Sequence, residues 1–395
     1  MTETHNIGRK PYYGIFNDSF PPILDGVTLT VENYVHWLRA RGKPACVVTP
    51  WNPVSAVTPY EVIRYFSLPI HSRRPYRYGY PKLDPFIWRR LRATPFRLLH
   101  SHCPFSSGRL AVYVKRKQNV PLIGTFHSKY EDDLKHSFRH VPWMVPIIMK
   151  RILDFFNACD QVWIPQAAVE ETVRRYGYRG PLEVVENGVD YADMVKGGMA
   201  EYKSEARREL GIPDNAVSLL FVGQHIWEKG IDIIADALLL LKGKLDFYMN
   251  FVGTGYALEP LKAKIDEAGL GSRVKINGVI HNRHMLGRYY AAADLFLFPS
   301  FYDNAPLVVR EAASMGVPSV IPFGSTASEV ISPGDNGFLT ERSPQAYADM
   351  ILRLVENMDS VRQAGISASR TLVKRWETVV DEVIDRYEVI LRQCR

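Results

Sequence analysis

Residues 293–321 read Ala-Asp-Leu-Phe-Leu-Phe-Pro-Ser-Phe-Tyr-Asp-Asn-Ala-Pro-Leu-Val-Val-Arg-Glu-Ala-Ala-Ser-Met-Gly-Val-Pro-Ser-Val-Ile, a strand pattern, a turn, a helix pattern and a second strand pattern. The first apolar run, Asp294 to Pro299, is short and rich in Phe, as in a buried strand. Pro306 suits the first turn of a helix, and Asn304 is the predicted cap of that helix. A strand, a helix and another strand in this order form the unit of a parallel sheet.

Two carboxylates lie on either side of this turn. Asp303 is in the mouth of the turn. Glu311 shares one helix face with apolar residues, namely Leu307, Val308 and Met315. Burying an unpaired carboxylate costs several kcal/mol, so Glu311 needs a reason to be there. Either the pair is a helix cap with a structural salt bridge, or the two carboxylates accept hydrogen bonds from the vicinal hydroxyls of a sugar or a ribose.

Length and composition indicate two domains in a reducing compartment. A chain of 395 residues exceeds the usual limit of a single core. Its four cysteines show neither metal-type spacing nor a disulfide framework, which favours a cytoplasmic setting. The polar N-terminus predicts no signal peptide, and no uncharged apolar run reaches the roughly 18–20 residues that span a bilayer. We therefore expect any membrane role to be peripheral.

Strand and helix patterns alternate along both halves of the chain, which predicts an α/β protein with parallel sheets covered on both faces. Expected strands are 12–17, 45–49, 96–100, 122–126, 162–165, 182–185, 219–222, 247–252, 274–276, 295–298 and 319–321. Expected helices in the first half are 27–41, 108–118, 145–157 and 168–176. We predict two doubly wound, Rossmann-like domains, 1–190 and 191–372, with a helix in 373–395 that packs back on the first domain. Ligands bind at the carboxyl ends of parallel strands, so two facing domains would hold a ligand in the cleft between them.

A basic and aromatic stretch in the first half indicates an anionic partner. Between Arg64 and Arg97 there are eight Arg and Lys82 against one acid, Asp84, interleaved with Tyr, Phe and Trp. Such a stretch suits an anionic membrane surface or a nucleic acid, or it is a solvated face over buried aromatic rings. A second stretch, 143–156, is apolar around a central Lys-Arg pair, and we expect a core-packing helix there rather than an interfacial one.

Several polar residues follow expected strand ends. Lys229 stands at the start of a helix, where a cation and free backbone N–H groups favour a diphosphate, although a surface lysine would look the same. In the first half, Gly26 lies between a strand and a helix and would allow close approach to a ligand. His127 follows another strand, and His100 and His102 lie at the end of a third. We predict no metal, because no further ligand is apparent beside these histidines.

Together these segments resemble the family 4 retaining glycosyltransferases of the GT-B architecture, over nearly the whole chain. That family has a Glu-x7-Glu motif where this chain has Asp303 and Glu311, followed by a small-residue helix like residues 311–316. The resemblance implies that Glu311 binds the ribose of the donor nucleotide and that Asp303, as a catalytic-site residue, binds a sugar hydroxyl. It implies further donor contacts from the backbone of a turn and of a base-binding loop, namely Asn304, Ala305, Pro306, Leu307 and Ile280.

This chain departs from the family pattern at two positions. The family usually clamps the diphosphate with Arg and, five residues later, Lys, whereas this chain has Gln224 and Lys229. One positive charge is missing, and another cation such as Arg283 would have to replace it. The first Glu of the motif is shortened to Asp303, which leaves the donor sugar open.

The N-terminal half is similar to the diacylglycerol glucosyltransferases and related lipid glycosyltransferases in segments 20–27, 100–105 and 125–132. This similarity implies that His127 lies beside the reacting carbon, with Asp25, His102 and Tyr130 on the acceptor side and Gly26 near the donor. The expected partners are then a nucleotide sugar, a lipid or glycan acceptor and an anionic membrane surface, not a nucleic acid.

We therefore expect a retaining, metal-independent and cofactor-free hexosyltransferase. It would move glucose from UDP-glucose to a lipid such as diacylglycerol, as a peripheral protein on the cytoplasmic face of a membrane. The rate enhancement would come from positioning of the two substrates and from stabilisation of the charge that develops in the transition state. Two alternatives stay open, a transferase for a polysaccharide or soluble sugar acceptor and a catalytically silent nucleotide-sugar-binding protein.

Overall fold

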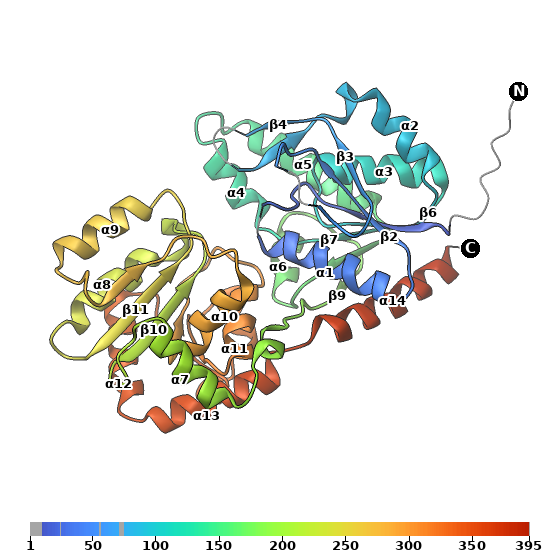
Figure 1. The fold of residues 1–395 in the computed structure, drawn as a ribbon. Helices are drawn as coiled ribbons and strands as arrows, with labels where there is room; N and C mark the ends of the chain where they lie inside the picture. Colours follow the sequence, from blue (N-terminus) through green and yellow to red (C-terminus); the bar gives the residue numbers. More distant parts are fainter. Residues whose placement is uncertain (1–9, 24, 55–56, 71–74, 395) are drawn as a thin grey trace, which may run out of the picture. The chain divides into compact units, whose positions relative to one another are not determined.

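The chain forms two compact units (Figure 1). The structure is a computed structural model that describes residues 10–23, 25–54, 57–70 and 75–394. Unit 1 comprises Met1–Gly188 with Trp376–Arg395, and unit 2 comprises Val189–Arg375. The divisions expected from sequence, after 190 and after 372, lie within a few residues of these.

Unit 1 is built on a parallel sheet with strand order β3-β2-β1-β6-β7-β8-β9. Parallel strands need crossover helices, which is why apolar strands alternate with amphipathic helices in this half. The strands are β1 (Tyr12–Phe16), β2 (Ala45–Pro50), β3 (Val62–Tyr65), β6 (Phe96–Ser101), β7 (Leu122–Thr125), β8 (Gln161–Ile164) and β9 (Leu182–Val184). A separate antiparallel pair is formed by β4 (Ser67–Pro69) and β5 (Arg77–Gly79).

The helices of unit 1 cover both faces of its sheet (Figure 1). They are α1 (Gly26–Ala40), α2 (Pro85–Ala93), α3 (Ser106–Gln118), α4 (Tyr130–Ser137), α5 (Met144–Ala158), α6 (Val169–Arg175) and α14 (Trp376–Gln393), with the short η2 (Pro81–Leu83). Buried residues of α2, α3, α5 and α6 pack against the sheet in one hydrophobic core. The predicted doubly wound architecture is confirmed for this unit.

Helix α14 packs on unit 1, as predicted for the C-terminal helix. Tyr387 is fully buried, and its ring stacks on Tyr13 and Trp163 at 5.6 and 5.7 Å. Glu388, one residue on, accepts hydrogen bonds from Lys43 and Arg97 at 2.8 Å each. The helix is therefore held by ring packing on one side and by ion pairs at its rim.

Unit 2 contains a second parallel sheet with strand order β12-β11-β10-β13-β14-β15. The strands are β10 (Val217–Val222), β11 (Phe247–Val252), β12 (Val274–Ile276), β13 (Leu295–Leu297), β14 (Ser319–Pro322) and β15 (Gly337–Thr340). The helices are α7 (Met199–Glu209), α8 (Ile231–Leu241), α9 (Leu258–Glu267), α10 (Arg283–Ala292), α11 (Leu307–Ser314), α12 (Pro344–Val355) and α13 (Met358–Thr371), with the short helices η3 (Tyr191–Met194), η4 (Trp227–Lys229) and η5 (Thr326–Val330). The strand order reverses between β10 and β13, which makes their carboxyl ends the expected binding edge.

Within the described ranges, no helix is both long and apolar enough to cross a membrane. The structure adds helices that were not predicted in the first half, α2 and α4, and strands that the sequence patterns did not predict, namely β3, β15 and the β4–β5 pair. These are short strands of three or four residues, for which periodicity carries little signal.

The ion pairs of Glu388 generate a stability prediction. We expect Glu388→Gln to lower the free energy of unfolding by about 1 kcal/mol, because the carboxylate is about one-third exposed and such pairs are weak. The hydrogen bond from Lys43 lowers the pKa of Glu388, so this stabilisation is present above the ordinary pKa of 4.5 and is lost as the pH falls below it. Denaturant unfolding at neutral and acid pH measures both effects.

The matched control for this prediction is Asp385→Asn, an exposed carboxylate on the same helix. The control should leave stability unchanged. Equal stability of Glu388→Gln and the native chain at neutral pH would contradict the role of these ion pairs.

Candidate active site

Lys229 and Asp303 meet at the point where the strand order of unit 2 reverses. Lys229 ends η4 in the loop after β10, and Asp303 lies in the loop after β13. Lys229 Nζ donates to Asp303 Oδ1 at 2.8 Å, across 74 residues of sequence. Ser300 Oγ donates to the other carboxylate oxygen at 2.7 Å. The residues predicted to bind the diphosphate and the sugar are therefore neighbours at the expected binding edge.

Glu311 is buried on α11, as its helix face predicts. Tyr290 of α10 donates to its Oε2 at 2.6 Å. Burial raises the pKa of Glu311, while the hydrogen bond from Tyr290 and the nearby charge of Arg283 lower it. The guanidinium of Arg283 lies 4.8 Å from the ring centre of Tyr191. Glu311 thus keeps strong acceptor oxygens in a site shielded from water.

The helices beside Lys229 and Asp303 begin without side-chain caps. Gly230 is the N-cap residue of α8 and Pro306 that of α11, and neither helix start has a side-chain cap hydrogen bond. The prediction that Asn304 caps this helix is wrong. Because α11 begins at Leu307, Asn304 lies two residues before the N-cap position and is buried instead. The N–H groups at both helix starts are thus left for other acceptors, such as an anion.

Glycines let the loops after β10, β11 and β12 pack closely. Gly253 has φ +139°, and a Cβ atom there would come within 1.9 Å of the Gly223 carbonyl oxygen. The Gly253 N–H donates to the carbonyl of Gly278 at 2.7 Å. Gln224, which follows Gly223, is exposed at this edge, and Ile280 is half-buried in the loop after β12. The predicted donor residues Gln224 and Ile280 are therefore carried by adjoining loops.

A chain of histidines follows the strand ends of unit 1. His102 Nδ1 lies 2.9 Å from His127 Nε2. His100 instead contacts Tyr387 and Thr125 at 2.7 and 2.6 Å, which ties it to the core. Burial lowers the pKa of His127 to about 4 and holds those of His100 and His102 well below the usual range. The three imidazoles are thus neutral at neutral pH, and His102 is the one that supports His127.

The other predicted residues of unit 1 have structural roles in the fold. Asp25 is the N-cap of α1 and accepts from the N–H of Thr28 at 2.7 Å. Its second oxygen accepts from Tyr76 at 3.0 Å, and Gly26 is the first residue of the helix. Tyr130 belongs to the hydrophobic core. The acceptor-side roles of Asp25 and Tyr130, and the donor role of Gly26, stay predictions.

Two partners of the predicted carboxylates did not follow from the sequence. Ser300 could have been found as a turn residue, because a Ser hydroxyl often accepts from the backbone N–H two residues on, as it does here from Tyr302 at 3.1 Å. No sequence pattern links Tyr290 to Glu311, since it lies 21 residues before Glu311 on another helix. Only the packing of α10 against α11 brings the phenol to the carboxylate.

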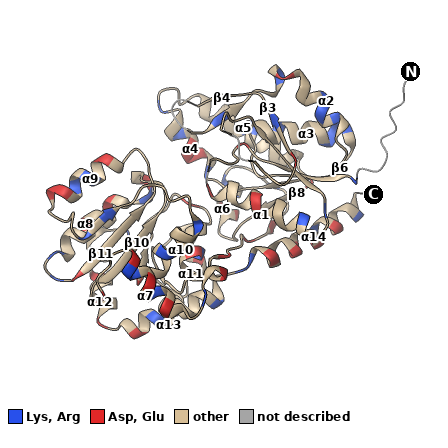
Figure 2. Ribbon diagram, viewed as in Figure 1, with Lys and Arg blue, Asp and Glu red and all other residues tan. Residues whose placement is uncertain are grey.

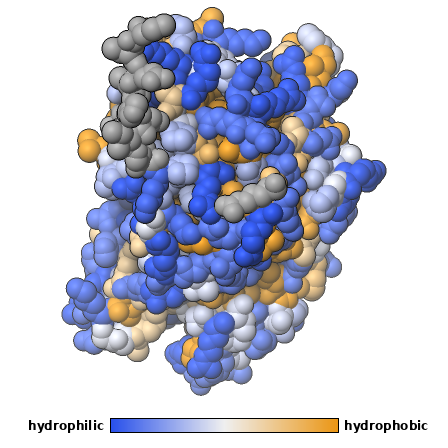
Figure 3. Space-filling view, turned by 90° about the vertical axis from the view of Figure 1, so that its right-hand side faces the viewer, coloured by the Kyte–Doolittle hydropathy of each residue, from blue (hydrophilic) through white to orange (hydrophobic). Residues whose placement is uncertain are grey.

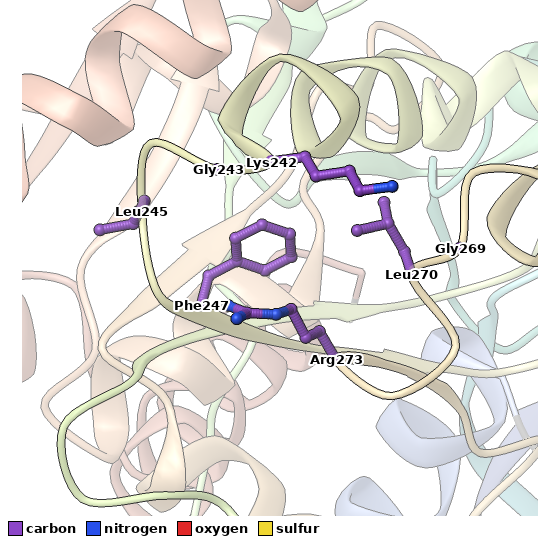
Figure 4. A pocket seen from close by; sticks show the side chains of 7 residues that line it. All are labelled: Lys242, Gly243, Leu245, Phe247, Gly269, Leu270 and Arg273. Carbon is purple, nitrogen blue, oxygen red and sulfur yellow. The ribbon is translucent and has the colours of Figure 1, made fainter.

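A pocket of about 240 Å³ lies at the other end of the unit 2 sheet (Figure 4). Its lining residues come from the ends of α8 and α9 and the amino end of β11, and they are Lys242, Gly243, Leu245, Phe247, Gly269, Leu270 and Arg273. None of the predicted site residues lines it. The described residues also form no group of three or more His, Cys, Asp or Glu side chains that could hold a metal ion.

Two family models match this chain. A model described as "Glycosyltransferase Family 4" matches residues 24–193, and one described as "Glycosyl transferases group 1" matches residues 216–357. The first covers the strands and helices that carry Asp25 and His127, and the second covers those that carry Lys229, Asp303 and Glu311.

The chain is also similar to characterised proteins along nearly its whole length. It is 23% identical to an alpha-monoglucosyldiacylglycerol synthase of Acholeplasma laidlawii, over 94% of this chain and 97% of that protein. It is 24% identical to a GDP-mannose-dependent alpha-mannosyltransferase of Corynebacterium glutamicum, over 97% of this chain and 90% of that protein. The crystal structure of Anabaena HepE in complex with UDP and glucose superposes with a TM-score of 0.78 at 19% identity, covering 96% of this chain and 100% of that one. This superposition confirms the predicted fold.

The burial of Glu311 leads to a prediction about the stability of the fold. Because burial raises its pKa, the ionised form costs stability at neutral pH, and this cost disappears below the ordinary pKa of 4.5. Gln keeps an acceptor for Tyr290 without the charge. We expect Glu311→Gln to raise the unfolding temperature by roughly 2–4 °C at neutral pH, and by less as the pH falls towards 4.5. Glu356→Gln, an exposed site in the same unit, is the control, and a lower unfolding temperature in Glu311→Gln would contradict the argument.

Proposed function

Because the chain belongs to the family 4 glycosyltransferases and has their GT-B fold, we propose that it transfers glucose from UDP-glucose, with retention, to a membrane lipid such as diacylglycerol. The observation that carries this proposal is the contact between Lys229 and Asp303 at the reversal of strand order, with Glu311 buried on the adjoining helix. A cation, two carboxylates and two helix starts without side-chain caps match the chemistry of a nucleotide sugar.

The ribose, the transferred sugar and the diphosphate of the donor each have a complementary group in unit 2. Glu311 accepts from the ribose hydroxyls, and Asp303 accepts from a hydroxyl of the transferred sugar. The diphosphate lies at the N–H groups of α8 and α11, with Lys229 beside it. The HepE structure, which contains UDP and glucose on the same fold, supports this choice of donor.

The proposed reaction is driven by positioning and by stabilisation of the leaving group. Lys229 and the helix N–H groups offset the charge that develops on the diphosphate as the glycosidic bond breaks. The acceptor hydroxyl attacks on the same face, and the leaving phosphate takes its proton. His127 is neutral and bonded to His102, so in this scheme it orients a sugar hydroxyl and carries no positive charge. No side chain is assigned as a nucleophile.

A basic and aromatic surface of unit 1 supports a lipid acceptor. On α2, Phe86 is 79% exposed beside the exposed Arg89 and Arg92, and Figure 2 shows Lys and Arg gathered on this helix. Arg73 and Arg74 of the same stretch lie outside the described residues. On the face in Figure 3, hydrophobic side chains are scattered among hydrophilic ones. A mixed surface of this kind suits the headgroup region of an anionic membrane better than a dry protein interface.

Helix α5 packs into the core and also carries exposed apolar and basic residues, so the expectation of a core-packing helix is only half right. Phe155 and Phe156 are buried, whereas Trp143 and Ile147 are 66% and 48% exposed, with the exposed Lys150 and Arg151 next along the helix. The Acholeplasma relative is named as a diacylglycerol-lipid synthase, which favours the same acceptor class. Our proposal keeps the cytoplasmic face of the membrane as the location.

Turnover of nucleotide sugars tests the proposed reaction. The protein is incubated with UDP-glucose, UDP-galactose, UDP-N-acetylglucosamine and GDP-mannose, with and without diacylglycerol vesicles, and released nucleotide is measured. We expect lipid-dependent release from UDP-glucose, and an at least roughly 100-fold loss in Lys229→Gln, because this side chain stabilises the leaving diphosphate. Lys262→Gln, an exposed lysine of α9, should keep native activity.

Two results of this experiment separate the alternatives. Turnover that needs no lipid would replace the lipid acceptor by a glycan or soluble sugar. No turnover with any donor would favour a silent nucleotide-sugar-binding protein, while GDP-mannose turnover would move the donor towards that of the Corynebacterium relative.

Binding to vesicles tests the membrane surface. Each Arg near an anionic lipid surface contributes about 1 kcal/mol, so the double variant Arg89→Gln, Arg92→Gln should bind phosphatidylglycerol vesicles roughly 30-fold more weakly. Arg353→Gln, Arg370→Gln in unit 2 changes the net charge equally and is the control. Equal loss in both double variants would show a general charge effect, and no loss in either would remove this surface from the proposal.

A further inference from the structure

The donor edge of unit 2 lacks positive charge for a diphosphate. Lys229 is paired with Asp303 at 2.8 Å, so the two side chains together contribute no net charge. The starts of α8 and α11 add about half a positive charge each. Gln224, at the position where the family resemblance implies an arginine, is neutral. A diphosphate group with two or more negative charges therefore needs another cation at this edge.

Arg342 reaches this edge from the far side of the sheet. It lies two residues after β15, and β14 separates β15 from β13. Its Nε donates to the carbonyl of Pro299, in the loop after β13, at 2.9 Å. Its guanidinium carbon lies 5.5 Å from the ring centre of Phe301 in the same loop. The side chain therefore crosses β14 towards the reversal of strand order.

The carbonyl of Pro299 also lies close to the start of α8. A Cβ atom on Gly230, the N-cap residue of α8, would come within 2.9 Å of this oxygen, which explains the glycine with φ +73°. Arg342 Nε and the start of α8 thus approach the same carbonyl group. Pro299 is followed by Ser300, whose hydroxyl donates to Asp303 at 2.7 Å.

The geometry of Arg342 leaves its charge available. Its Nε is used by Pro299, and the part of the chain that the structure describes pairs no carboxylate with it. Arg342 is exposed, and Nε anchoring leaves the two terminal nitrogens as a fork that fits two phosphate oxygens. Phe301 holds the guanidinium plane by stacking, which limits the entropy lost on binding.

Arg283, the cation expected from sequence to fill this role, is placed differently. It begins α10, which follows β12 at the opposite edge of the sheet. Its guanidinium stacks on Tyr191 and acts on the buried Glu311. Its charge therefore serves the carboxylate predicted to bind the ribose.

We propose that Arg342 binds the donor diphosphate and supplies the positive charge that Gln224 does not provide. This inference rests on the proposed function, because it concerns the same nucleotide-sugar site. It makes Arg342 a binding residue that replaces, from the loop after β15, a charge that the family resemblance places after β10.

Calorimetric titration with nucleoside diphosphates and monophosphates tests this proposal. UDP and GDP are compared with UMP and GMP on the full chain, so that the outer phosphate is the only difference within each pair. We expect Arg342→Gln to weaken binding of the preferred diphosphate roughly tenfold or more and that of its monophosphate far less, because a charge-assisted hydrogen bond to the outer phosphate is lost. Arg342→Lys should recover part of the affinity, and thermal unfolding verifies that each variant is folded.

A rescue variant makes the test specific. Adding Gln224→Arg to Arg342→Gln should restore diphosphate binding to within a few-fold of native, since either arginine can meet the same phosphate. Arg283→Gln, as the comparison, should weaken diphosphate and monophosphate alike. Native diphosphate affinity in Arg342→Gln together with a loss in Lys229→Gln would overturn the Arg342 proposal alone. Failure of the native chain to bind any of the four nucleotides would overturn both this proposal and the proposed function.

Discussion

The reversal of strand order between β10 and β13 is the constraint on which the candidate site of unit 2 depends. Helices that follow these two strands run to opposite faces of the sheet, so their starts diverge and leave a crevice at the strand ends. Lys229 and Asp303 stand at this crevice and form an ion pair across 74 residues. The glycines at 230 and 253 let the surrounding loops approach one another at distances that a side chain would block.

The site of unit 2 contains one ion pair, one buried carboxylate and one further cation. Lys229 is matched by Asp303, and Arg283 acts on Glu311 from the other side. The pair with Lys229 spares Asp303 the cost of an uncompensated charge. The charge of the buried Glu311, in contrast, is offset only in part by the hydrogen bond from Tyr290 and the nearby charge of Arg283. Binding of a donor then requires the ion pair between Lys229 and Asp303 to open. Arg342 lies outside the Lys229–Asp303 pair, and for this reason it can add net attraction for an anion.

In unit 1, three histidine rings are kept uncharged inside the core. His100 lies in β6, His102 and His127 follow the ends of β6 and β7, and the three rings stack in sequence. Tyr387 of α14 and Thr125 of β7 bond the innermost ring. Through His100 and His102, the C-terminal helix thus supports the histidine that the resemblance places at the reacting carbon, although Tyr387 and His127 are far apart in the sequence.

The sequence by itself determined the α/β class, the alternation of most strands and helices, and the residue types at the strand ends, because periodicity and turn residues are local properties. It also gave Glu311 a buried helix face, since neighbours three and four residues apart are known from the chain alone. The contacts of these residues needed the tertiary structure. Tyr290 reaches Glu311, Tyr387 reaches His100 and Arg342 reaches Pro299 only through the packing of separate elements. Asn304 failed as a cap because the exact start of a helix depends on the turn before it, and short strands such as β15 carry too few residues for a period to show.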